Sequence, residues 1–128
     1  MHAVWNSLPR QSFWIRWGPA ILVMVLIFML SSVPSKEMPS FGNFDLSVKK
    51  GGHMLGYALL ARSYLWALGG SRSKNWALAW GLAVVYAATD EFHQLFVPGR
   101  GAWIVDVGID GVGALLGLLI ARLSAWRR

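Results

Sequence analysis

The segment Ala20–Leu30 reads AILVMVLIFML, an apolar run without a polar residue. It lies inside a longer, mostly apolar stretch from Phe13 to Val33. A helix needs roughly 20 mostly apolar residues to cross the hydrocarbon core of a bilayer, and this stretch is long enough. It predicts a membrane-spanning helix over residues 13–33 and indicates that lipid surrounds much of the chain.

A secretory signal peptide is the main alternative for this segment, because it also has a basic start and an apolar middle. The residues after the run, Ser31-Ser32-Val33-Pro34, contain no clean small-x-small cleavage site. The flanking apolar residues also exceed what a signal peptide needs. We therefore expect a helix that is not cleaved.

The overall composition supports a membrane location. Charged residues make up 14% of the chain, whereas soluble domains contain about 25%. The net charge of +6 fits contact with anionic lipid headgroups better than nucleic acid, because the basic residues border apolar runs and form no long block. The chain has no cysteine, which excludes disulfides, thiolate metal sites and cysteine nucleophiles.

Three further spans are predicted at residues 51–68, 76–96 and 103–123, after a loop over residues 34–48. The last two connections are short, which places consecutive helices antiparallel. The sequence thus predicts an all-α membrane protein, a single domain over residues 1–128 folded as a four-transmembrane-helix antiparallel bundle. Two glycine pairs, Gly52 with Gly56 and Gly113 with Gly117, lie one helical turn apart, a spacing that favours close helix packing in lipid.

Basic residues set the predicted orientation, because Lys and Arg are in excess on the cytoplasmic side. We therefore place both termini in the cytoplasm. The side that holds the termini carries Arg10, Arg16, Arg72, Lys74, Arg122, Arg127 and Arg128, and the opposite side carries Lys36, Lys49, Lys50 and Arg100.

Ionisable residues gather near the outer ends of the predicted spans. Each one at the centre of a bilayer costs about 2.5–3.5 kcal/mol, so such residues generally have a function. Asp90 and His93 are three residues apart, and Asp106 and Asp110 are four apart, so each pair shares a helix face. If these faces point inward, they form a polar pocket open to the outer surface. The predicted site comprises Lys50, His53, Tyr57, Asp90, Glu91, His93, Gln94, Arg100, Asp106 and Asp110.

Two interpretations of the acidic residues remain open. Asp90, Glu91 and Asp106 are either a catalytic or cation-binding cluster, or a structural network that fixes helix register. His53 and His93 can act as metal ligands or as general acids and bases, but the chain has no His-Glu-x-x-His motif. Whether the site holds a metal or another cofactor therefore stays open.

Arg100 and two serines also have alternative roles. Arg100 follows Pro98-Gly99, which fixes its backbone in a turn. Its guanidinium either forms an anion-binding rim with Lys49 and Lys50, or anchors the protein to lipid headgroups. Ser31 and Ser32 are conceivable nucleophiles, but serines at a helix end more often satisfy backbone groups.

Three motifs stand out within residues 20–120. They are Ser31-Ser32-x-Pro34, Lys50-x-x-His53-x-x-x-Tyr57, and Asp90-Glu91-x-His93-Gln94-x-Phe96-x-Pro98-x-Arg100 followed by Asp106. Together they resemble the VanZ-like family of small bacterial membrane proteins. The resemblance implies a multi-pass protein of the bacterial inner (cytoplasmic) membrane. It also implies a link to cell-envelope phenotypes, including resistance to glycopeptide antibiotics such as teicoplanin.

Asp110 departs from the family pattern, which usually has asparagine at this position. Asparagine can donate a hydrogen bond, whereas an ionised aspartate only accepts. We therefore expect Asp110 to be either protonated or paired with a cation.

The site predicts a protein that binds a polar-headed or phosphate-bearing envelope lipid, or a lipid-linked cell-wall precursor, at the outer face. Two alternatives are a membrane enzyme acting on a lipid-linked phosphate and a small proton-coupled carrier. Membrane lipids are the expected partners, nucleic acid is not, and the oligomeric state stays open.

The predicted orientation can be tested with one cysteine. Because the chain has no native cysteine, Ala102→Cys creates a single label site beside Arg100. We expect this site to react with a membrane-impermeant maleimide in intact cells. Reaction only after lysis would reverse the topology.

Overall fold

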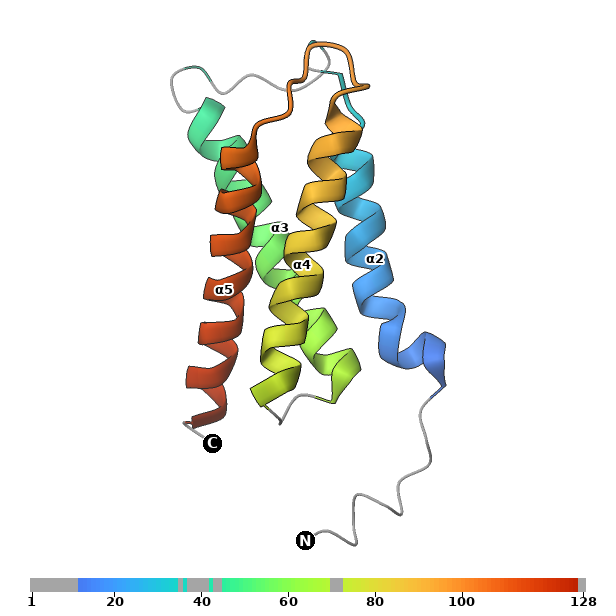
Figure 1. The fold of residues 1–128 in the computed structure, drawn as a ribbon, viewed down its shortest axis with the longest axis vertical. Coiled ribbons are helices and arrows are strands. Elements are labelled where there is room, and N and C mark those ends of the chain that lie inside the picture. The colour runs from blue at the N-terminus through green and yellow to red at the C-terminus, as the bar shows by residue number, and fades with distance from the viewer. Residues whose placement is uncertain (1–11, 35, 37–41, 43–44, 70–72, 127–128) are drawn as a thin grey trace, which may run out of the picture.

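The structure is a computed structural model that describes residues 12–34, 36, 42, 45–69 and 73–126. These residues form four α-helices and no strand (Figure 1). The prediction of an all-helical protein is confirmed. The helices are α2 (Phe13–Ser31), α3 (Asp45–Leu68), α4 (Ser73–Gln94) and α5 (Ile104–Trp126).

Helix α3 differs most from its predicted boundaries. It begins at Asp45, so Gly51 and Gly52, which were expected at the start of the span, lie inside the helix. Lys50, which lies in this early part of the helix, is 2.9 Å from Asp106 on α5.

A tight turn connects α4 to α5. Helix α4 ends at Gln94, two residues earlier than predicted. The Arg100 N–H donates to the Val97 carbonyl at 3.1 Å, and Gly99 has a φ of +75°. Pro98 at the second position and a positive-φ glycine at the third are typical of a type II turn. The prediction that Pro98-Gly99 fixes the Arg100 backbone is confirmed.

Consecutive helices run in opposite directions, so α2 and α4 point one way and α3 and α5 the other (Figure 1). Helix α3 packs against all three other helices, whereas α2 packs against α3 and α4 only. The most extensive contact joins α3 and α5, which are parallel and far apart in sequence. The sequence analysis considered only antiparallel neighbours and missed this pairing.

Two glycines bring α3 and α5 into backbone contact. A Cβ on Gly113 would lie 2.6 Å from the Met54 carbonyl oxygen, and one on Gly117 would lie 2.6 Å from that of Ala58. The predicted close packing is confirmed for this pair. It is wrong for Gly52, which has no atom within 4 Å of such a Cβ, because α3 presents Met54 and Ala58 to α5 instead.

Large apolar side chains lie on the outside of the molecule and small ones inside. Helix α2 exposes most of its apolar residues, such as Leu22 and Met29, while alanines including Ala83 and Ala87 are fully buried. Helix α2 and the segment Ile104–Ser124 of α5 are long and apolar enough to cross a membrane, each with a mean hydropathy of 2.0. The buried polar residues are Ser31, Asp90, Glu91, Gln94 and Asp110.

The contact between α3 and α5 predicts a position-dependent effect of added methyl groups. Gly117→Ala forces the two backbones apart and should destabilise the protein by about 1–3 kcal/mol. Gly108→Ala on the same helix is the control, because its new Cβ meets nothing within 4 Å. Thermal unfolding in detergent compares the two variants, and equal melting temperatures would contradict the close contact.

Candidate functional site

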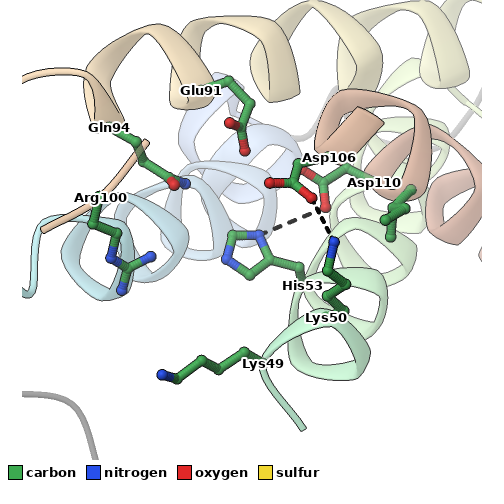
Figure 2. A pocket seen from close by; sticks show the side chains of 9 residues that line it. Lys49, Lys50, His53, Glu91, Gln94, Arg100, Asp106 and Asp110 are labelled. Carbon is green, nitrogen blue, oxygen red and sulfur yellow. Dashed lines mark hydrogen bonds and ion pairs between the residues drawn. The ribbon is translucent and has the colours of Figure 1, made fainter. Parts of the chain in front are cut away.

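A pocket lies at the end of the bundle where α3 and α5 begin and α4 ends (Figures 1 and 2). Its volume is about 130 Å³. Most of the residues predicted for the site contribute to it. The lining residues are Lys49, Lys50, His53, Glu91, Gln94, Arg100, Asp106, Ile109 and Asp110.

Two charged contacts join α3 to α5 inside the pocket. Lys50 Nζ lies 2.9 Å from Asp106 Oδ1, and His53 Nδ1 lies 3.6 Å from Asp110 Oδ1. The two contacts are one helical turn apart on both helices and follow the same parallel register as the glycine contacts. Lys50 and Asp106 are partly exposed, whereas the Asp110 side chain is buried. His53 therefore provides the cation-capable partner expected for Asp110.

Glu91 contributes a buried carboxylate from α4. Its side chain is only 5% exposed, and Oε2 accepts a hydrogen bond of 3.2 Å from the Trp103 backbone N–H. This bond links α4 to the residue that precedes α5. Glu91 forms no ion pair within the described part of the chain.

Arg100 connects the turn to the end of α2. Its Nε donates to the Val33 carbonyl at 3.2 Å, and Nη2 donates to the Leu30 carbonyl at 3.3 Å. Carbonyls at a helix C-terminus have no intrahelical partner and carry partial negative charge, so a guanidinium is favoured there. Arg100 therefore has a structural role as well as a position in the pocket lining.

Asp90 and Tyr57 are buried and do not line the pocket. Asp90 Oδ2 accepts a hydrogen bond of 2.9 Å from Ser31 Oγ and a longer one of 3.4 Å from Gln94 Nε2. Tyr57 is fully buried, and its hydroxyl has no hydrogen-bond partner among the described residues. Ser31, Asp90 and Gln94 form a buried polar layer that joins α2 to α4.

His93, which was predicted to belong to the same polar cluster, does not line this pocket and faces the end of α2 instead. Its ring stacks on Phe28 of α2 at 4.3 Å between centroids, and Nε2 lies 2.9 Å from Ser32 Oγ. His93 is one position before Gln94, so the helix turns it toward α2 while Gln94 faces the pocket. The Asp90-x-x-His93 step therefore does not present both side chains to one ligand.

The two serines have different roles. Ser32 Oγ donates to the Phe28 carbonyl at 2.7 Å, which confirms its predicted role in satisfying the backbone. Ser31 instead donates to a buried carboxylate, a contact that the sequence analysis did not predict. Its position at the end of the first span, level with Asp90, is the only sequence signal for this contact.

The described residues contain no group of three or more His, Asp or Glu side chains arranged to hold a metal ion. The arrangement instead combines cationic and anionic side chains around a small opening. Such a pocket can bind a charged headgroup through hydrogen bonds and ion pairs.

Comparison with known proteins gives one match. A family model described as VanZ/LLP1 matches residues 17–125, which is most of the chain. The resemblance inferred from the motifs is thereby confirmed. Searches of curated proteins and of solved structures found no match.

The buried Ser31 hydrogen bond predicts a difference between two serine variants. Ser31→Ala removes the donor to Asp90 and should lower the free energy of unfolding by about 1.5–3 kcal/mol, as for other hydrogen bonds to charged groups. Ser63→Ala is the control, because its hydroxyl donates only to the Leu59 carbonyl of its own helix. Detergent unfolding curves measure both, and equal stability of the two variants would contradict the assigned contact.

Proposed function

Since the chain belongs to the VanZ/LLP1 family, we propose that it is an inner-membrane protein whose pocket binds an envelope lipid. The bound group is a phosphate-bearing headgroup, carried either by a phospholipid or by a lipid-linked cell-wall precursor. All four helices cross the membrane, and the pocket opens at the outer face.

The dimensions and surfaces of α3 and α4 support four spans. The helices have 24 and 22 residues. At 1.5 Å per residue, both exceed the roughly 30 Å of a bilayer core. Both also expose large apolar side chains, such as Leu55 and Leu59 on α3 and Val85 on α4, which lipid would cover.

The convergence of basic side chains on the pocket is the observation that carries the proposed function. Lys49 and Lys50 come from the first turns of α3, and Arg100 comes from the loop that precedes α5 (Figure 2). Lysine and arginine at the level of the headgroups are the side chains that bind phosphate groups. The excess of basic residues near the termini supports an outer location for this end of the bundle.

The contact between Ser32 and His93 is the observation that favours an enzyme. A serine 2.9 Å from a histidine nitrogen resembles a nucleophile and its base. However, the Ser32 hydroxyl donates to the Phe28 carbonyl, and neither residue lines the pocket. Binding therefore fits the geometry better than catalysis.

A proton-coupled carrier needs a polar path through the bundle. The buried acidic residues all lie near the pocket end: Glu91 and Asp110 line the pocket, and Asp90 contacts Ser31 at the end of α2. Toward the other end, the buried residues that the structure describes include Leu60, Leu65 and several alanines, with Tyr64 as the one hydroxyl-bearing residue. This distribution favours a binding site at one face over a relay across the membrane.

Native mass spectrometry of the gently purified protein tests the proposed function. We expect an adduct with the mass of a phospholipid or a polyprenyl phosphate, and we expect Arg100→Ala to lose most of it. Arg62→Ala is the matched control, because Arg62 is an exposed arginine of α3 about 13 Å along the helix from His53.

Because Arg100 also binds the end of α2, Lys50→Gln provides a second pocket variant. Retention of the same lipid adduct by both folded pocket variants and by the control would contradict the proposed function. The charged residues would then serve as a network that fixes helix register.

A further inference from the structure

Among the residues that the structure describes, three basic and three acidic side chains line the pocket. They are Lys49, Lys50 and Arg100, and Glu91, Asp106 and Asp110. A purely anionic ligand would be attracted by the basic side chains and repelled by the acidic ones over similar distances. A phosphate-bearing group that also carries a positive charge therefore matches this lining better than a phosphate alone.

Charges of opposite sign also lie on different sides of the pocket, apart from Lys50, which pairs with Asp106. In Figure 2, Lys49 and Arg100 lie on one side of the His53 ring, and Glu91 and the Lys50–Asp106 pair lie on the other. A ligand with a negative and a positive group would align with the separation between Lys49 and Arg100 on one side and Glu91 on the other. Each end of the ligand would then be attracted by a nearby opposite charge.

Glu91 is the carboxylate available for a positive group of the ligand. The other two acidic lining residues already have partners in α3, since Asp106 pairs with Lys50 and Asp110 contacts His53. Glu91 receives only the Trp103 N–H and has no cationic partner in the residues that the structure describes. A carboxylate buried to this degree is costly without a counter-ion, so a cation at this position would be favoured.

The size of the pocket restricts the ligand further. Its volume of about 130 Å³ is well below the roughly 300–1,000 Å³ of sites that enclose drug-sized molecules. A small headgroup fits these dimensions, whereas the sugar and peptide of a complete cell-wall precursor would extend outside the pocket.

The lining also distinguishes between kinds of amine. Quaternary ammonium groups are recognised by cages of aromatic side chains. Among the residues that the structure describes, no Trp, Tyr or Phe lines the pocket. A primary ammonium, in contrast, can donate hydrogen bonds directly to a carboxylate such as that of Glu91.

We propose that the pocket selects a zwitterionic headgroup with a phosphate and a primary amine, which is the chemistry of phosphoethanolamine. The phosphate lies beside Lys49 and Arg100, and the ammonium lies beside Glu91. This inference rests on the proposed function, because it names the class of lipid that the same pocket binds.

A competition between lipids with identical acyl chains tests the inference. The purified protein is incubated with equal amounts of dioleoyl phosphatidylethanolamine, phosphatidylcholine and phosphatidylglycerol, and bound lipid is measured by native mass spectrometry. We expect phosphatidylethanolamine to be retained about 30-fold over phosphatidylglycerol, the effect of one desolvated charge pair. We expect about 10-fold over phosphatidylcholine, which keeps the positive charge but cannot donate a hydrogen bond to the Glu91 carboxylate. Glu91→Gln keeps the acceptor for the Trp103 N–H, loses the negative charge, and should abolish this preference.

Equal retention of phosphatidylethanolamine and phosphatidylcholine by the wild-type protein would overturn the inference without any variant. A preference that persists in folded Glu91→Gln would overturn it as well. If phosphatidylglycerol binds as well as phosphatidylethanolamine and Arg100→Ala abolishes both, the inference fails but the proposed function stands. If neither Arg100→Ala nor Lys50→Gln reduces the binding of any lipid, the inference and the proposed function both fail.

Discussion

The backbone contact between α3 and α5 is the constraint on which the rest of the structure depends. Gly113 and Gly117 leave room for the Met54 and Ala58 backbones, and this fixes the relative height of two parallel helices. In lipid, helices gain little from burying apolar surface against each other, so van der Waals packing of this kind drives their association. The same register then places Lys50 beside Asp106. Lys50 lies about one helical turn before Met54, and Asp106 lies about two turns before Gly113.

The polar end of the bundle follows from that register. Once the relative position of α3 and α5 is set, the two acidic residues of α4 face different neighbours. Asp90 contacts α2, and Glu91 lines the pocket. Asp90 Oδ2 accepts a hydrogen bond from Ser31, and Glu91 Oε2 accepts one from the backbone of Trp103. Arg100 then joins the α4–α5 turn to the end of α2. Through this turn, Arg100 also couples α5 to α2, two helices that form no direct contact.

The apolar runs, the short turns and the small-residue pair were sufficient to predict four helices and one close contact. The parallel pairing of α3 with α5 could not be predicted. Helical periodicity shows which face of a helix carries small residues, but it does not show which other helix packs against that face. The same limit explains the error for Gly52, whose spacing to Gly56 matches that of the pair on α5.

Clustering of the charged residues at one end was predictable from their depth, because the short connections place the span ends together. The direction of each side chain was not. His93 and Gln94 are adjacent in sequence, yet one contacts α2 and the other lines the pocket. Helical spacing alone grouped Asp90 with both residues, and only the position of α2 separates them. Ser31 became recognisable as a partner of Asp90 for the same reason.

Photo-crosslinking with a phospholipid that carries a diazirine on its headgroup tests the central claim most directly. The claim is that a headgroup occupies the pocket between α3, α4 and α5. Peptide mapping should then find the label concentrated within residues 49–53 and 91–110. Label distributed evenly over both ends of the bundle, or confined to the exposed faces of α2 and α5, would contradict a specific headgroup site.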